Sequence, residues 1–180
     1  ENKVFAFSNL AALINYAATF AITFVLSLYL QYAKGMRPGE AGLVLITQPA
    51  VMAFVAIVVG RFVNKYDSRV LASLGMAVIV VGLLLLFFLK TDTSNTYLIL
   101  CLILIGSGFG LFTTPNTNAV MGSVESKQFG VASAILGSMR LMGQMISMAV
   151  AAMVINIFIG KNIISSNNIK VVYPGKESKK

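Results

Sequence analysis

Apolar residues run along most of the chain in long stretches without charged side chains. A helix rises about 1.5 Å per residue, so about 20 residues cross the roughly 30 Å hydrocarbon core of a bilayer. The stretches are residues 4–33, 41–60, 70–89, 93–124 and 128–159. Each reaches the required length, and only the last contains a charge, Arg140. The pattern therefore predicts about five transmembrane segments.

These segments have the periodicity of helices and lack that of membrane strands. In lipid, the backbone must satisfy its own hydrogen bonds, which leaves helices or closed barrels. Barrel strands alternate apolar and polar residues, whereas residues 78–89 are apolar almost throughout. The predicted fold class is an all-α integral membrane protein.

Polar turns rich in helix-breaking residues set the boundaries of the predicted spans. The spans are residues 5–32, 41–61, 70–89, 97–114 and 129–159. Together they form one helical bundle over residues 1–159. Residues 160–180 are rich in Asn, Ser and Lys, and we expect a polar, mobile tail or an external loop there.

Composition supports a multi-pass protein of the cell membrane. Hydrophobic residues make up 57% of the chain and charged residues 11%, whereas soluble domains carry about 25% charged residues. The net charge of +8 comes from residues that flank the spans and from five lysines after residue 159. This distribution argues against nucleic acid as a partner and favours the lipid bilayer.

Basic residues in the loops predict the orientation, because cytoplasmic loops carry the excess of Lys and Arg. One side of the membrane holds Lys3, Arg61, Lys65, Arg69 and Lys127. The other side holds Lys34, Arg37 and Lys90 in its short loops. The first side, called side one below, is predicted to be cytoplasmic, and the opposite side is called side two.

A polar stripe follows the first span. Asn15, Thr19, Thr23 and Ser27 recur every four residues and share one face of a helix, beside an aromatic stripe that begins with Tyr16. Such a stripe faces other helices or a water-filled cavity. Asn15, Tyr16, Thr19 and Thr23 are therefore candidates for lining a substrate site, and hydrogen bonding between helices is the alternative.

The second span contains Gln48 followed by Pro49. Proline removes a backbone donor and frees the carbonyl four residues earlier, that of Leu45. We expect a kink or hinge at this point. Gln48 is a further candidate for hydrogen bonding to a ligand or to a neighbouring helix.

Small residues mark the fourth span. Gly106 and Gly110 have the GxxxG spacing that lets another helix backbone approach closely. Pro115 follows, and we expect it to break the span near its end, with partial continuation of the connector at residues 115–128 as helix left open.

Arg140 lies about 12 residues into the fifth span. An arginine within the bilayer costs about 2.5–3.5 kcal/mol on insertion scales, so it must face the interior, a cavity or an interface. Binding of an anionic or polar substrate group is one interpretation, and snorkelling of the side chain toward side one is the other. Gln144, one turn later on the same face, joins the candidates.

Titratable groups suited to catalysis are missing from the spans. The sequence has no His, and its six acids lie outside the spans: Glu1, Glu40, Asp67, Asp92, Glu125 and Glu177. No nucleophile–base pair or metal-binding cluster can form within the spans from this set. We therefore expect a protein that is not an enzyme and has no cofactor or metal.

The loop at residues 60–69 resembles the loop signature of the major facilitator superfamily. That signature runs Gly, three residues, Asp, a basic residue, one residue, Gly, one residue, and a basic residue. Gly60, Lys65 and Arg69 match, whereas Asn64 replaces the acid and Asp67 replaces the second glycine. The resemblance implies that this loop joins the second and third helices of a six-helix half and takes part in gating.

Three further stretches resemble the C-terminal half of fourteen-span drug antiporters of the EmrB/QacA type, namely residues 35–42, 106–121 and 130–149. The resemblance implies that the chain corresponds to the ninth to thirteenth spans, most of a six-helix half. The N-terminal half and the last helix of such a transporter are its implied partners. The implied activity is export of small amphipathic drugs or metabolites by proton antiport.

Three alternatives stay open from the sequence, and one of them is a channel formed by several copies of a five-span subunit. A symporter of a sugar or another metabolite would share the same superfamily. A membrane scaffold subunit that transports nothing would belong to another class. A coupling carboxylate elsewhere in the transporter would favour proton coupling, because the spans of this chain contain none.

Overall fold

The computed structural model describes residues 2–63, 66–90 and 93–165, with side chains up to residue 157. Every regular element in these residues is a helix. They are α1 (Lys3–Leu28), α2 (Pro38–Leu45), α3 (Thr47–Phe62), α4 (Ser68–Phe87), α5 (Asn95–Gly122) and α6 (Phe129–Ser165). A π-helical turn, η1 (Tyr29–Ala33), extends α1, and a 3₁₀ turn, η2 (Ser126–Gln128), precedes α6.

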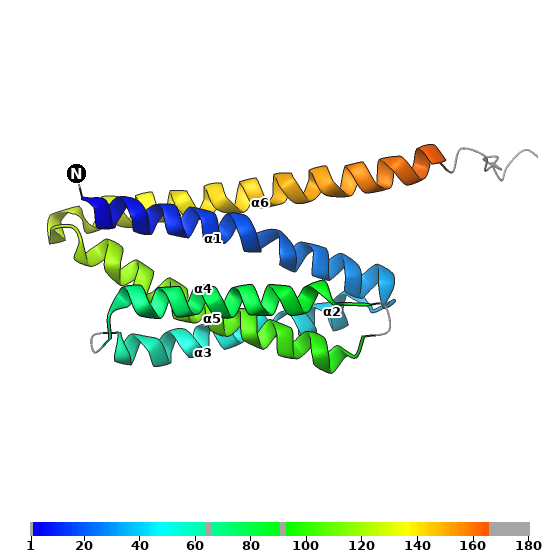
Figure 1. Ribbon diagram of the computed structural model, residues 1–180, viewed down its shortest axis with the longest axis horizontal. Helices are drawn as coiled ribbons and strands as arrows, with labels where there is room; N and C mark the ends of the chain where they lie inside the picture. The colour runs from blue at the N-terminus through cyan, green and yellow to red at the C-terminus, as the bar shows by residue number, and fades with distance from the viewer. Residues whose placement is uncertain (1, 64–65, 91–92, 166–180) are drawn as a thin grey trace, which may run out of the picture.

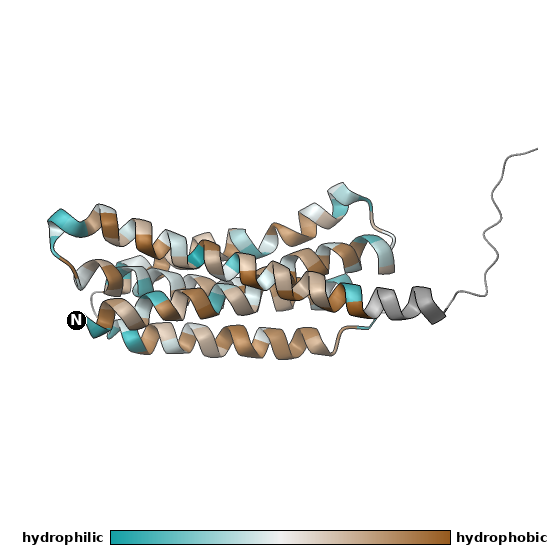
Figure 2. Cartoon of the chain, turned by 90° about the horizontal axis from the view of Figure 1, so that it is seen from above, coloured by the Kyte–Doolittle hydropathy of each residue, from teal (hydrophilic) through white to brown (hydrophobic). Residues whose placement is uncertain are grey.

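Five of the helical units in the described residues are long and apolar enough to cross a membrane, with α2 and α3 counting as one. The prediction of an all-α membrane protein with five spans is therefore confirmed. Large apolar side chains such as Phe54, Ile57 and Leu84 are exposed, as lipid-facing residues are. Figure 2 shows hydrophobic residues along the lengths of the helices and hydrophilic residues gathered mainly at their ends.

The helices form two groups (Figure 1). The long helices α1 and α6 lie side by side, and α3 and α4 both pack on α5. The helix α5 is the most buried span in the described part of the chain, and it also contacts α1 and α6. It therefore joins the two groups.

Glycines allow the closest approaches between helices. A Cβ atom added to Gly106 would lie 2.5 Å from the carbonyl oxygen of Gln48 on α3, and one on Gly110 would lie 2.9 Å from that of Met52. A Cβ on Gly143 of α6 would lie 2.5 Å from the carbonyl oxygen of Leu13 on α1. The backbones of α3 and α5, and of α1 and α6, are thus in direct contact.

Apolar clusters fill the remaining space between helices. Near side two, Leu26 and Leu30 pack with Leu98 and Leu102. Near side one, Val120 packs with Ala132 and Leu136. The first cluster connects the α1 end with α5, and the second, which also includes Ala12, connects α1, α5 and α6.

The second span is interrupted where the sequence places its proline. Helix α2 ends at Leu45 and α3 begins at Thr47, with Ile46 between them as a turn residue. Pro49 has no N–H to donate to the carbonyl of Leu45, and this loss weakens the first turn of α3. The interruption lies beside the first of the two cavities described below.

The predicted break of the fourth span at Pro115 is wrong. Helix α5 continues through Pro115 to Gly122. A proline costs one backbone hydrogen bond, and transmembrane helices tolerate this where neighbouring helices and hydroxyl groups compensate. Pro115 is buried, and the hydroxyl of Thr117 donates to the carbonyl of Thr113 at 2.8 Å.

The predicted start of the C-terminal tail is also wrong. Helix α6 continues past residue 159 to Ser165, because apolar residues extend to Ile164 and no helix breaker follows Gly160 directly. The remainder of the predicted tail, residues 166–180, lies outside the described residues.

Candidate functional site

A cavity of about 480 Å³ opens between α1, the α2–α3 junction, α5 and α6. Its volume is within the range of sites for small molecules. Apolar side chains dominate its lining, with several hydroxyl and amide groups among them. The lining residues are Tyr16, Thr19, Phe20, Thr23, Gly42, Leu45, Ile46, Gln48, Pro49, Met52, Phe109 and Gln144. We call this space the central cavity.

Five of the seven predicted substrate-lining residues share this cavity: Tyr16, Thr19, Thr23, Gln48 and Gln144. They come from three different helices, and the fold brings them together. The hydroxyl of Thr23 donates to Oε1 of Gln48 at 3.4 Å, a long hydrogen bond that connects α1 to the α2–α3 junction. The amide nitrogen of Gln48 and the amide of Gln144 have no partner among the hydrogen bonds described here, so they are available to a ligand.

The N-terminal part of the polar stripe on α1 takes part in helix packing and also lines the cavity. Thr19 is buried, and its hydroxyl donates to the carbonyl of Asn15 at 2.6 Å. Asn15 is 2% exposed and does not line the cavity. Its Oδ1 atom is buried without a hydrogen-bond partner among the described residues. The stripe thus divides between helix packing at Asn15 and the cavity from Tyr16 to Thr23.

Arg140 lies behind the wall of the central cavity and does not line it. Its guanidinium carbon is 5.9 Å from the centre of the Tyr16 ring, within the range of a cation–π interaction. Its Nη2 atom donates to the hydroxyl of Thr117 at 2.8 Å. Its Nε atom is buried without a partner among the described residues.

Sequence reasoning missed several residues of this site, of which Phe109 and Thr117 are the most informative. Phe109 lines the cavity, and its ring lies 5.9 Å from that of Tyr16 in a tilted contact. It stands between Gly108 and Gly110, in a segment that we interpreted as packing alone. Thr117 accepts a hydrogen bond from Arg140. Because a break was expected at Pro115, Thr117 was not expected to lie in the interior. Treating residues 97–122 as one helix would have placed Thr113 and Thr117 one turn apart on one face.

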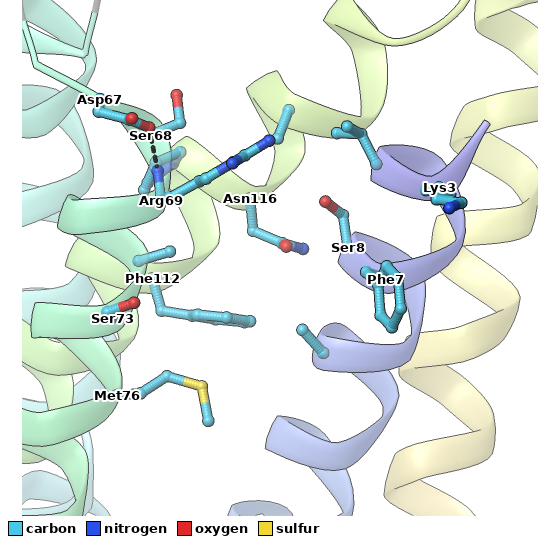
Figure 3. Close-up of a pocket in the computed structure, with 15 residues that line it drawn as sticks. Lys3, Phe7, Ser8, Asp67, Ser68, Arg69, Ser73, Met76, Phe112 and Asn116 are labelled. Atoms are coloured by element: carbon cyan, nitrogen blue, oxygen red, sulfur yellow. Dashed lines mark hydrogen bonds between the residues drawn. The ribbon is translucent and has the colours of Figure 1, made fainter.

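A second cavity, of about 790 Å³, lies at side one between α1, α4 and α5 (Figure 3). Its lining includes Lys3, Phe7 and Ser8 of α1, Arg69, Ser73 and Met76 of α4, and Phe112 and Asn116 of α5. Asn116 is 5% exposed and projects into this space, and its Nδ2 atom has no partner in the described part of the chain. We call this space the α1–α4 groove.

The predicted gating loop borders the α1–α4 groove. Asp67 caps α4 by accepting a hydrogen bond from the backbone N–H of Arg69 at 2.9 Å, and both residues line the groove. Gly60 is near the end of α3, where added side-chain atoms would meet open space. Asn64 and Lys65 lie outside the described residues. The gating role of the loop stays a prediction.

Comparison with known proteins decides the family. The family model described as Major Facilitator Superfamily matches residues 9–163. The chain belongs to the major facilitator superfamily. The resemblance read from the loop and from the three further stretches is thereby confirmed at the level of the superfamily. Its proteins are transporters, which also agrees with the expectation that the chain is not an enzyme.

Relatives of this major facilitator chain carry names of transporters and efflux pumps. It is 30% identical over 155 residues to "Uncharacterized transporter YebQ" of Escherichia coli (strain K12), which covers 86% of this chain and 34% of that protein. It is 31% identical over 138 residues to "Multidrug resistance protein Stp" of Mycobacterium tuberculosis (strain ATCC 25618 / H37Rv), covering 77% and 26%. It is 26% identical over 140 residues to "Riboflavin transporter RibZ" of Clostridioides difficile (strain 630), covering 78% and 31%.

The chain thus spans about a third of the length of these relatives, between 26% and 34%. No solved structure shows significant similarity to it.

Proposed function

We propose that this chain supplies most of the C-terminal half of a fourteen-span exporter of small amphipathic drugs or metabolites. The central cavity is the observation that carries the proposal, because three helices bring their polar residues to one space beside an interrupted helix. The relatives named for multidrug resistance and for riboflavin transport support organic molecules as cargo.

The lining of the central cavity suits amphipathic molecules with broad variation in shape. Phe20, Met52 and Phe109 supply apolar contact, and methionine adapts to different partners. Gln48 and Gln144 offer amide donors and acceptors without a fixed charge. A few polar groups in an apolar pocket are typical of sites that orient a ligand.

Proton coupling, the proposed energy source, has to come from another part of the transporter. The spans of this chain contain no acid, and proton-driven carriers need an embedded group that takes up and releases protons. The carboxylate is therefore assigned to the N-terminal half. The interruption at Ile46 is the proposed flexible point through which movement of that half is transmitted to the cavity.

The last helix of the transporter is the proposed occupant of the α1–α4 groove. Major facilitator halves consist of two inverted three-helix repeats. Here α5 pairs with α3 as α1 pairs with α6, so α1 and α5 occupy equivalent positions. Helix α4 packs on α5. The helix that would pack on α1 in the equivalent way would follow α6 in the chain. That helix would return from side two to side one and pass along α1 beside α4.

Transport by the full-length protein in inverted membrane vesicles tests the proposed function. A panel of amphipathic dyes, including ethidium and carboxyfluorescein, is offered with a proton gradient. We expect uptake into the vesicles that stops when an uncoupler is added. Gln48→Leu should reduce the flux of the best dye about 5-fold, the value of about one hydrogen bond.

Gln31→Leu is the matched control, because Gln31 is outside the cavity and bonds to Ser27. Its flux should equal that of the wild type. If no dye in the panel moves faster than in vesicles without the transporter, export of such molecules is disproved. If flux is normal in Gln48→Leu, the central cavity is not the site.

A further inference from the structure

Arg140 is a charged residue of the fifth span, and the proposed function assigns it no role. We infer that Arg140 sets the charge preference of the central cavity, so that the transporter favours anionic amphipathic molecules over cationic ones. The inference rests on the proposed function, and it adds the class of substrate. Its basis is a half-buried cation packed on a residue of the cavity wall and the absence of acids from the spans.

The positive charge of Arg140 is held in place without a carboxylate. Its Nη2 atom bonds to the neutral hydroxyl of Thr117, and its guanidinium packs on the Tyr16 ring. Neither partner carries a negative charge. The Nε atom has a donor hydrogen and no acceptor among the described residues.

The acids of the chain are engaged elsewhere or lie outside the spans. Glu40 accepts a hydrogen bond from the backbone of Arg37 at the start of α2. Asp67 caps α4, and Glu125 forms an exposed ion pair with Lys127 at 3.6 Å. Glu1, Asp92 and Glu177 are outside the spans by sequence. The spans of this chain therefore contain one charged residue, and it is positive.

One contact and one helical neighbour connect this charge to the central cavity. Tyr16 receives the guanidinium on its ring and also lines the cavity. Gln144 follows Arg140 by one turn of α6 and lines the same space. One layer of side chains therefore separates a ligand that touches Tyr16 and Gln144 from the guanidinium of Arg140.

The size of the effect follows from Coulomb's law. Two charges about 7 Å apart interact strongly enough, at an effective dielectric constant of about 20, to change binding at least 10-fold. An anionic ligand and a cationic ligand of similar shape should therefore differ in affinity by at least this factor. A cavity lined by amides and aromatic rings offers a cation no carboxylate in compensation.

The competing arrangement is a carboxylate from the rest of the transporter that pairs with Arg140. Such a pair would cancel the charge at the cavity, and the transporter would then accept cations and anions alike. Charge discrimination therefore separates the two arrangements.

The test measures binding of two dyes with one xanthene core, the anion carboxyfluorescein and the cation rhodamine 123, to the purified full-length transporter. Fluorescence anisotropy gives both Kd values. We expect the wild type to bind the anion at least 10-fold more tightly. Arg140→Gln should remove most of this preference, and Arg140→Lys should keep part of it. Arg37→Gln, an equal loss of charge at the start of α2, should leave the ratio of Kd values unchanged.

Gln144→Glu provides a test that does not require removal of Arg140. It places a carboxylate on the cavity wall one turn from Arg140, where it can pair with the guanidinium and cancel its charge, so the preference for the anion should be lost. Equal Kd values for the two dyes in the wild type, or a ratio unaffected by both Arg140→Gln and Gln144→Glu, would overturn the inference. Vesicle flux of the same dyes is recorded separately. If both dyes are transported at equal rates, the proposed export function is retained and the charge preference is not. If neither dye is transported, the export function is contradicted, even where the two Kd values differ.

Discussion

Single glycines on α5 determine how closely its neighbours approach. The carbonyl oxygens of Gln48 and Met52 occupy the space that side chains at Gly106 and Gly110 would need. On the opposite surface, Gly108 lies against the carbonyl oxygen of Gly75 on α4. The positions of Gln48 and Met52 in the central cavity therefore depend on glycines that do not touch it.

Gly106→Ala should destabilise the protein, because the added methyl group meets backbone atoms that cannot rotate away. Overpacking of this kind costs about 1–3 kcal/mol. Gly137→Ala is the matched control on α6, where a Cβ meets no atom within 4 Å. It should be neutral, or stabilising by up to about 1 kcal/mol, since alanine favours helix.

Thermal unfolding of the purified chain reports both changes. Cys101 is buried, so a dye that fluoresces on reacting with thiols labels it only as the protein unfolds. The apparent Tm should fall for Gly106→Ala and stay or rise for Gly137→Ala. An unchanged Tm for Gly106→Ala would show that α3 and α5 are not in backbone contact.

At the scale of elements, two prolines in similar sequence contexts have different effects. Pro49 lies three residues after an interruption, whereas Pro115 lies within a continuous helix. Pro49 is exposed, and Pro115 is buried against neighbouring helices. The contrast indicates that packing decides whether the backbone bond lost to proline becomes a break.

Pro49→Ala should make α2 and α3 more continuous, because alanine restores a donor for the carbonyl of Leu45. We expect hydrogen exchange of the amides around Ile46 to slow about 5-fold, as for one additional hydrogen bond. Substrate flux should fall at the same time if the interruption transmits movement. Pro115→Ala should leave exchange near Ile46 unchanged. Faster exchange in Pro49→Ala would contradict the proposed cause of the interruption.

The sequence predicted the positions of the helices better than the contacts between them. Uncharged stretches located all five spans, because lipid imposes a length and a composition on each. The polar stripe identified Thr19 and Thr23, but the same periodicity could not separate Asn15, which is buried in a helix contact. Phe109 and Thr117 join the site through the pairing of α5 with α1 and α6, and no pattern within one helix contains that pairing.

At the scale of the whole molecule, the described residues leave two kinds of surface open. Helices α3 and α4 expose large apolar side chains, and the α1–α4 groove contains the unpartnered amide of Asn116. Lipid can cover the exposed apolar side chains. It cannot satisfy the amide of Asn116, because an amide donor needs a hydrogen-bond acceptor. The groove is therefore the surface where a partner that offers a hydrogen-bond acceptor would gain most.

Ser73→Cys tests occupation of the α1–α4 groove. Ser73 is exposed at the groove in this chain. A water-soluble maleimide should label it readily in residues 1–180 in detergent and much more slowly in the full-length transporter. Tyr66→Cys, exposed in the loop at side one, should react equally in both. Equal labelling of Ser73→Cys in both proteins would show that no helix of the transporter covers the groove.

The pairing of α1 with α6 has a consequence for synthesis at the ribosome. The backbone N–H of Ala21 donates to the hydroxyl of Ser147, 126 residues later in the chain. Chains grow at about 5–20 residues per second, so α1 is made roughly 6–25 seconds before its main partner. During that interval the surface of α1 that packs on α6 is in the membrane without its partner. Helix α1 therefore depends on whatever shields it at the insertion machinery until the fifth span arrives.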